Sequence, residues 1–236
     1  PLDSSAASDV YKRQDIVLVG DSLGSVLYNY KSTREVSLNT MIEHSKSVRL
    51  GVKKSLMVVD MPHNTYRNSK EALKNAKQII SKTKCDAVKL EGGKKIYEII
   101  KILVKNNIPV MGHLGLLPQS AKNFKFKGKQ NYEREKILKE AKLLETAGVF
   151  SMVLECIESS LAKNITKTIK IPTIGIGASN NCDGQILVFD DLIGLNPINV
   201  RFVKKYTNIR KDISKAVLNY AREVRNMKFP LKKHSY

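Results

Sequence analysis

The sequence predicts an α/β fold, a (β/α)8 TIM-type barrel, and three observations support this prediction. Short runs of β-branched and other apolar residues alternate with longer amphipathic segments along the chain. The runs are apolar almost throughout, as expected of parallel strands that are covered on both faces. Several runs end on polar residues, and the active sites of such barrels lie at the carboxyl ends of the strands.

Seven strands are expected, one for each short run that is rich in β-branched and other apolar residues. They span residues 16–19, 56–59, 87–90, 110–112, 151–154, 173–176 and 186–189. Two stretches of the chain echo each other. DAVKLE ends at Glu91, FSMVLE ends at Glu155, and each precedes a strand that opens with Ile-Pro. Such an echo is typical of a repeated βα unit.

Five helices are expected between and after the strands, where apolar residues recur at helical spacing. Their apolar faces fall within residues 72–80, 99–104, 137–147, 161–169 and 213–224. Gly148 follows the third of these segments, so we expect it to cap that helix in a left-handed conformation.

A closed barrel needs eight strands, one more than the sequence indicates. The first fourteen residues show neither helical nor strand periodicity, and we interpret them as a foreign adapter or scar. They stand where a first strand and helix would be, so the expected barrel lacks both. The catalytic domain is then expected at residues 15–236. An open, doubly wound sheet is the alternative.

Composition limits the partners and the compartment. The net charge of +19 is compatible with nucleic acid, an anionic membrane surface or an acidic substrate. The lysines are scattered over helices without interleaved aromatics, which favours solvated helix faces, and we expect no nucleic-acid partner. No apolar run is long enough to cross a membrane. Three cysteines without metal-ligand spacing indicate unpaired thiols in a reducing compartment, and we expect a cytoplasmic protein.

Three carboxylates, those of Asp21, Asp60 and Glu91, stand at the ends of three expected strands. Each alone is equally well explained as the cap of a following helix. Together they converge on one end of a barrel. Oxygen ligands without a neighbouring imidazole or thiolate suit Mg²⁺, or Mn²⁺, better than zinc. Three close acids would also repel one another unless a cation held them.

Three further residues at strand ends are candidates for chemistry. Lys89 shares a strand face with Glu91, so it either pairs with an acid or binds a substrate carboxylate or a developing oxyanion. Glu155 ends an apolar strand and is a candidate general base. His113 is either a structural imidazole or a hydrogen-bonding partner within the site.

The strand-end motifs, taken together, resemble those of the ketopantoate hydroxymethyltransferase family. In chain order they are VGDSLG, DMP, VKLEGG, GHLGLLPQS, VLEC, IPTIGIGA and DGQILV. The resemblance implies a β/α barrel that uses Mg²⁺ to transfer a hydroxymethyl group from 5,10-methylenetetrahydrofolate to 3-methyl-2-oxobutanoate. The product, 2-dehydropantoate, leads to pantothenate and coenzyme A.

The resemblance also implies roles for single residues. The Mg²⁺ ligands would be Asp21, Asp60 and Glu91, some of them through water. The substrate contacts would be Ser22, Asp60 and Lys89, and the proton acceptor would be Glu155. Members of the family assemble as homo-oligomers, often decamers. Two alternatives stay open: a related Mg²⁺-dependent barrel lyase or mutase for another 2-oxo acid, and a basic nucleic-acid-binding protein.

Overall fold

The computed structural model describes residues 14–121 and 125–236. Contacts divide the chain into one unit that ends at Ile186 and a second unit, Leu187–Tyr236. The interpretation of residues 1–14 as foreign lies, except for Gln14, outside the described residues and stays a prediction.

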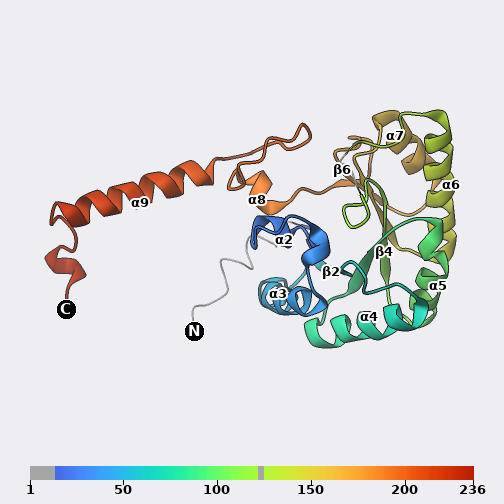
Figure 1. Cartoon of the computed structure of the whole chain (residues 1–236), viewed down its shortest axis with the longest axis horizontal. Coiled ribbons are helices and arrows are strands. Elements are labelled where there is room, and N and C mark those ends of the chain that lie inside the picture. Colours follow the sequence, from blue (N-terminus) through green and yellow to red (C-terminus); the bar gives the residue numbers. More distant parts are fainter. Residues whose placement is uncertain (1–13, 122–124) are drawn as a thin grey trace. The chain divides into compact units, whose positions relative to one another are not determined.

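Seven parallel strands form one sheet in the first unit, and each pairs with its neighbours in the chain (Figure 1). They are β1 (Ile16–Val19), β2 (Leu56–Asp60), β3 (Ala87–Glu91), β4 (Val110–Gly115), β5 (Ser151–Glu155), β6 (Thr173–Ile176) and β7 (Gly184–Gln185). The strands lie in the sheet in the same order as in the chain, as in a β/α barrel. This excludes the doubly wound alternative, in which the strand order reverses. Within the described residues β7 does not pair with β1, so the curled sheet is open there.

The seventh strand is the one that was placed wrongly, at residues 186–189. β7 lies just before this range, and only the N–H of Ile186 still bonds to β6, at 3.0 Å from the Gly175 carbonyl oxygen. Phe189 instead begins the short helix α8 (Phe189–Leu192), which has two aspartates in its first turn. Acidic residues stabilise a helix when they lie near its N-terminus, so the two aspartates favour a helix at Phe189 over a continued strand.

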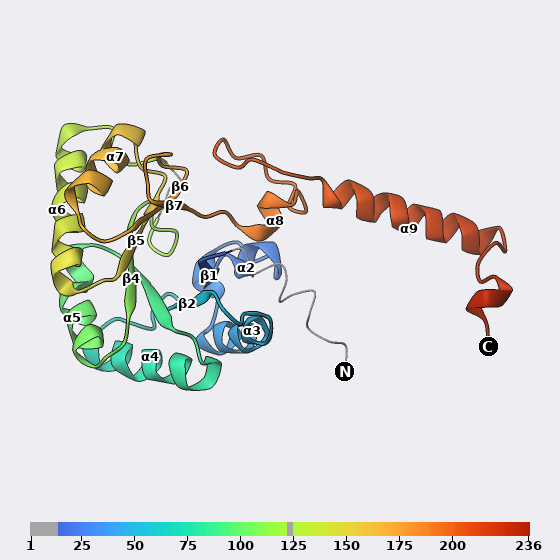
Figure 2. The ribbon, with the colours of Figure 1, turned by 180° about the vertical axis from the view of Figure 1, so that it is seen from behind.

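Five helices agree with the predicted ones: α4 (Ser69–Thr83), α5 (Tyr97–Lys105), α6 (Asn131–Ala147), α7 (Ser159–Thr168) and α9 (Ile209–Arg225). Gly148 follows α6 with φ +96°, as predicted. Three helices were missed: α2 (Leu23–Val26), α3 (Leu38–Gly51) and α8, which was described above. Short 3-10 helices lie at Thr33–Glu35, Lys94–Ile96 and Lys232–His234. Helices α3 to α7 follow one another along the outside of the sheet (Figures 1 and 2).

Two apolar layers hold the first unit together. The outer layer fills the space between helices and sheet and includes the fully buried Met41, Ile79, Leu103 and Leu144. The inner layer lies on the sheet face turned away from the helices and consists of Val58, Ala87, Met111, Val153 and Ile174. Since side chains alternate along a strand, the residue two positions after each inner residue points to the same inner face.

The second unit contains α8 and α9. Helix α9 buries none of its side chains and exposes a set of large apolar ones: Ile213, Val217, Leu218, Tyr220 and Val224. Among the described residues, no helix is both long and apolar enough to cross a membrane.

The three cysteines are unpaired, as the sequence predicts: Cys85, Cys156 and Cys182. Burial and the neighbouring Glu155 carboxylate raise the pKa of the Cys156 thiol to about 11. A thiol of this kind is protonated at neutral pH and therefore a poor nucleophile.

Candidate active site

The predicted site residues follow the inner apolar layer along the strands. Strand pairing sets Asp60 beside Lys89 and Glu91 beside His113. On β5, the next strand, Val153 pairs with His113, and Glu155 pairs with Gly115, two residues closer to the carboxyl end. All five are at the carboxyl ends of their strands, where β/α barrels carry their active sites. The alternation that predicted a shared face for Lys89 and Glu91 is confirmed by this arrangement.

Lys89 is the buried cation of the site. Its Nζ lies 2.8 Å from Asp60 Oδ1 and 3.2 Å from His113 Nδ1. Burial opposes its charge, but the carboxylates of Asp60, Glu91 and Asp21 outweigh burial and raise the pKa of Lys89 above its ordinary value. Of the two predicted roles, pairing with an acid is therefore the one that the side chains display.

His113 connects this ion pair to Glu155. An ammonium group only donates hydrogen bonds, so His113 Nδ1 accepts one from Lys89 Nζ. Nε2 lies 3.2 Å from Glu155 Oε2. The side chains of Asp60, Lys89, His113 and Glu155 thus form a continuous line, here called the polar row. His113 lies within the site, as a partner of other site residues.

Asp21 follows β1 and lies against Asp60. The Asp21 N–H donates to Asp60 Oδ2 at 3.0 Å, and Asp21 Oδ2 accepts from Gln119 Nε2 at 2.8 Å. Burial, followed by the charge of Asp60, raises the pKa of Asp21 to about 8. Burial also raises the pKa of Glu91. The cluster therefore resists carrying three negative charges without a further cation.

The stability of the metal-free protein should fall as pH rises from about 5 to 8. Between the unfolded pKa of 3.8 and the folded value of about 8, native Asp21 keeps a proton that the unfolded chain loses. Each pH unit then costs up to about 1.4 kcal/mol of unfolding free energy from this one group. Urea unfolding of the parent and of Asp21→Asn at both pH values measures it. A parent slope no steeper than that of Asp21→Asn would contradict the prediction.

Glu155 and Ser22 are the more open members of the site. The Glu155 side chain is 16% exposed, whereas that of His113 beside it is 2% exposed. Ser22 precedes α2, but its hydroxyl makes no capping bond to that helix. Both side chains therefore keep polar atoms free to meet a ligand.

Two residues of the site were not predicted, Tyr66 and Gln119. The Tyr66 O–H donates to Gln119 Oε1 at 2.5 Å. Burial, followed by the charge of Glu91, raises the pKa of Tyr66 above its ordinary value. Gln119 lies in the GHLGLLPQS motif, but a lone glutamine in a loop looks like a solvated side chain. The motif itself was the one available signal.

Three carboxylates of the site are of the chemical type that binds a magnesium ion, but they are not grouped closely enough to bind it without water. Asp21, Asp60 and Glu91 supply buried carboxylate oxygens, the ligands that Mg²⁺ prefers. In residues 14–121 and 125–236, however, no three histidine, cysteine, aspartate or glutamate side chains are grouped so that they could hold a metal ion. Because Mg²⁺ usually keeps several of its waters, the fit requires contacts through water.

Gly115 sets the position of Glu155 from the neighbouring strand. It has φ +102°, and a Cβ there would overlap the Glu155 carbonyl oxygen and lie 2.6 Å from Ile157 Cγ1. Gly115→Ala should therefore lower the free energy of unfolding by about 2 kcal/mol or more, through strain and overpacking. Thermal or urea unfolding measures this.

Gly184→Ala is the matched control for this change. Its Cβ would meet nothing closer than 3.8 Å, from Ile174 Cγ1. We expect its stability to stay within about 1 kcal/mol of the parent, as for an ordinary glycine in an extended segment. Equal losses in the two variants would show that crowding at Glu155 is not the cause.

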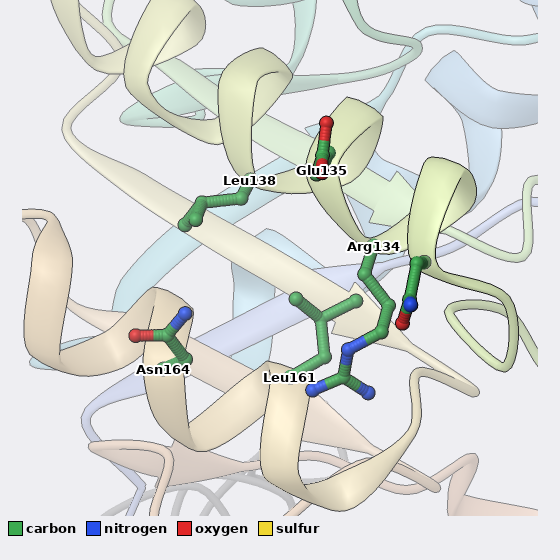
Figure 3. A pocket seen from close by; sticks show the side chains of 6 residues that line it. Arg134, Glu135, Leu138, Leu161 and Asn164 are labelled. Atoms are coloured by element: carbon green, nitrogen blue, oxygen red, sulfur yellow. The ribbon is translucent and has the colours of Figure 1, made fainter.

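A surface pocket of about 230 Å³ lies elsewhere, between α6 and α7 (Figure 3). Arg134, Glu135 and Leu138 line it from α6, and Leu161 and Asn164 from α7. The Arg134 guanidinium is already bound to Glu158 Oε2 at 2.6 Å. None of the predicted site residues lines this pocket.

Comparison with known proteins agrees with the motifs and the fold. Residues 2–232 match the family model described as ketopantoate hydroxymethyltransferase. A 3-methyl-2-oxobutanoate hydroxymethyltransferase from Pelagibacter ubique is 72% identical over 230 residues, which cover 98% of this chain and 90% of that protein. One from Rhizobium etli is 48% identical and covers 94% and 83%. A solved phosphonopyruvate hydrolase, 11% identical, shares the fold with a TM-score of 0.60, over 98% of this chain and 84% of its own.

Proposed function

This chain belongs to the ketopantoate hydroxymethyltransferase family, and on that premise we propose that it transfers a hydroxymethyl group to 3-methyl-2-oxobutanoate. The observation that carries this is the 72% identity to a curated enzyme of that name over 98% of the chain. The one-carbon donor that we propose is 5,10-methylenetetrahydrofolate, as the motif resemblance implies. The product would be 2-dehydropantoate, for pantothenate and coenzyme A synthesis.

We propose that Asp21, Asp60 and Glu91 hold Mg²⁺, partly through water. Their pKa directions support this, because burial and mutual repulsion disfavour the ionised cluster unless a cation is present. When bound, Mg²⁺ would supply Lewis-acid stabilisation of negative charge on the keto oxygen of a 2-oxo acid.

Lys89 and Ser22 are proposed to bind the substrate. Lys89 is charged and buried, so it can neutralise the substrate carboxylate without competition from bulk water. Asp60, which is already paired with Lys89 at 2.8 Å, fixes where that ammonium group lies. The uncommitted Ser22 hydroxyl would donate a hydrogen bond at the same end of the sheet.

Glu155 is proposed to take the proton from C3, the carbon next to the ketone. Its carboxylate is partly exposed and lies 3.2 Å from His113 Nε2. The C3 carbanion then forms a carbon–carbon bond to the one-carbon unit of the folate. Both C–N bonds between the one-carbon unit and the folate break, and water supplies the hydroxyl oxygen. The proton taken from C3 and one proton of that water pass to the two folate nitrogens, so that tetrahydrofolate leaves.

One assay tests the proposed reaction. The protein, Mg²⁺, 3-methyl-2-oxobutanoate and 5,10-methylenetetrahydrofolate should yield 2-dehydropantoate and tetrahydrofolate in equal amounts. Retained metal binding without turnover of these substrates would favour the related barrel lyase or mutase instead. Omission of Mg²⁺, with a chelator present, should abolish product formation if the metal is required.

We also propose a cytoplasmic homo-oligomer. The exposed apolar side chains of α9 support the assembly, since contiguous apolar surface commonly marks contact with another protein. The unpaired cysteines support a reducing compartment. Light scattering after size exclusion measures the assembly, and a monomer would contradict it. Cell fractionation tests the compartment.

A further inference from the structure

Gln119 is a buried glutamine that joins the ends of three strands. Its Nε2 donates to Asp21 Oδ2, after β1, at 2.8 Å. The same nitrogen donates to the carbonyl oxygen of Met61, after β2, at 3.0 Å. Its backbone N–H donates to Glu91 Oε2, at the end of β3, at 3.0 Å. Only 3% of the residue is exposed.

The orientation of the Gln119 amide is determined by its neighbours. Asp21 Oδ2 and the Met61 carbonyl are both acceptors, so the NH₂ group must face them. The amide oxygen then faces Tyr66, whose O–H donates to it at 2.5 Å. The opposite orientation would set three acceptors against one another and leave the Tyr66 hydroxyl with the more distant Glu91 carbonyl oxygen, at 3.5 Å, as its acceptor.

The backbone of Gln119 is also fixed. Arg34 Nε donates to the Gln119 carbonyl oxygen at 2.7 Å, and one of the Arg34 guanidinium nitrogens donates to the Ala121 carbonyl oxygen. With its main chain anchored and both ends of its side-chain amide bonded, Gln119 can hold the carboxylates that contact it at a set separation.

We propose that Gln119 is a positioning residue that sets Asp21 and Glu91 for a divalent cation. It binds one oxygen of each carboxylate and leaves the other oxygen for the cation or its waters. This inference rests on the proposed metal role of Asp21 and Glu91. Groups that orient metal ligands in this way typically affect metal affinity 10- to 100-fold.

The test measures Mn²⁺ binding to the full chain, without substrate, from the electron paramagnetic resonance signal of the free ion. Gln119→Leu keeps the side-chain size but removes the bonds to Asp21 and Met61. We expect it to weaken Mn²⁺ binding 10- to 100-fold. Gln130→Leu is the matched control, because Gln130 is exposed and makes no capping bond to α6. It should bind Mn²⁺ as the parent does.

A double-mutant cycle separates positioning from a general structural role. If Gln119 acts through Asp21, then Gln119→Leu should cost less than about threefold in an Asp21→Asn background. The inference is overturned if Gln119→Leu weakens Mn²⁺ binding as much in the Asp21→Asn protein as in the parent. It is also overturned if a folded Gln119→Leu protein binds Mn²⁺ within twofold of the parent. Should Gln119→Leu not unfold cooperatively, Gln119→Asn replaces it, since its amide is one methylene too short to reach, and the same limits apply.

The same experiment also tests the proposed metal site separately. Asp21→Asn alone should weaken Mn²⁺ binding. If it does and Gln119→Leu does not, the metal site stands and the inference about Gln119 fails. If the parent binds Mn²⁺ and Asp21→Asn binds it equally well, the proposed ligand set fails, and the inference fails with it.

Discussion

Replacing Glu155 by glutamine is expected to slow deuterium exchange at C3 of 3-methyl-2-oxobutanoate by 10² to 10⁴-fold. Glutamine keeps the size of the side chain and its place beside His113 Nε2, but it cannot accept the C3 proton. General bases contribute rate factors of this order. The measurement is the loss of the methine proton signal by NMR in D₂O, with Mg²⁺ and without folate, so that only proton removal is observed.

The matched control is Glu135→Gln. Glu135 is largely exposed on α6, where it forms a weak ion pair with Lys139 at 3.9 Å. Its replacement should leave the exchange rate unchanged. The Glu155→Gln protein should also retain its Mn²⁺ affinity, because Glu155 is not among the proposed ligands. Exchange at the parent rate in Glu155→Gln would remove Glu155 as the base.

The fold could be predicted wherever local pattern and tertiary environment agree. β3 and β5 are mostly apolar before their last residues, Glu91 and Glu155, and the residues before these acids are all buried. Helix α3 was missed because its buried positions include a serine, Ser45, and its apolar residues do not form a clear stripe. Residues 186–189 form an apolar run but no strand, because only Ile186 bonds to β6 and α8 begins at Phe189.

The site could be predicted as far as the strands determine it. Alternation along the strands turns Lys89, Glu91 and His113 to one face, strand pairing sets Lys89 beside Asp60, and the Lys89 side chain then reaches His113. Gln119 could not be found in this way. Its burial depends on how the loop after β4 folds back over three strand ends, and the sequence carries no periodic signal for such a loop.

The convergence of the three acids was only partly foreseen. Repulsion among them was expected to require a cation, and the buried cation that the structure displays is Lys89. One ammonium group balances one carboxylate, so the remaining acids keep raised pKa values, as Asp21 does at about 8. The lysine and the proposed Mg²⁺ are therefore complementary: each stabilises a different part of the same negative cluster.

Replacing Lys89 by methionine is accordingly expected to lower the free energy of unfolding by about 3–5 kcal/mol near pH 8. Methionine fills the space of the side-chain stem, but it leaves Asp60 buried without its partner at 2.8 Å. Breaking one member of a buried pair typically costs this much, because the other charge stays uncompensated. Urea unfolding without metal measures the loss. Since domains of this kind have about 5–15 kcal/mol of stability, the variant should fold but only marginally.

The pH dependence of that loss distinguishes charge from packing. Without Lys89, the buried acids can be neutralised by protons, and burial already raises the pKa values of Asp21 and Glu91. Native acids with raised pKa values bind protons that the unfolded chain releases, so the loss should be smaller at pH 5 than at pH 8. Lys101→Met is the control, because Lys101 is exposed and lies 3.6 Å from Glu98, and it should cost less than about 1 kcal/mol. A loss in Lys89→Met that is the same at both pH values would show that packing, and not the ammonium charge, is what Lys89 contributes.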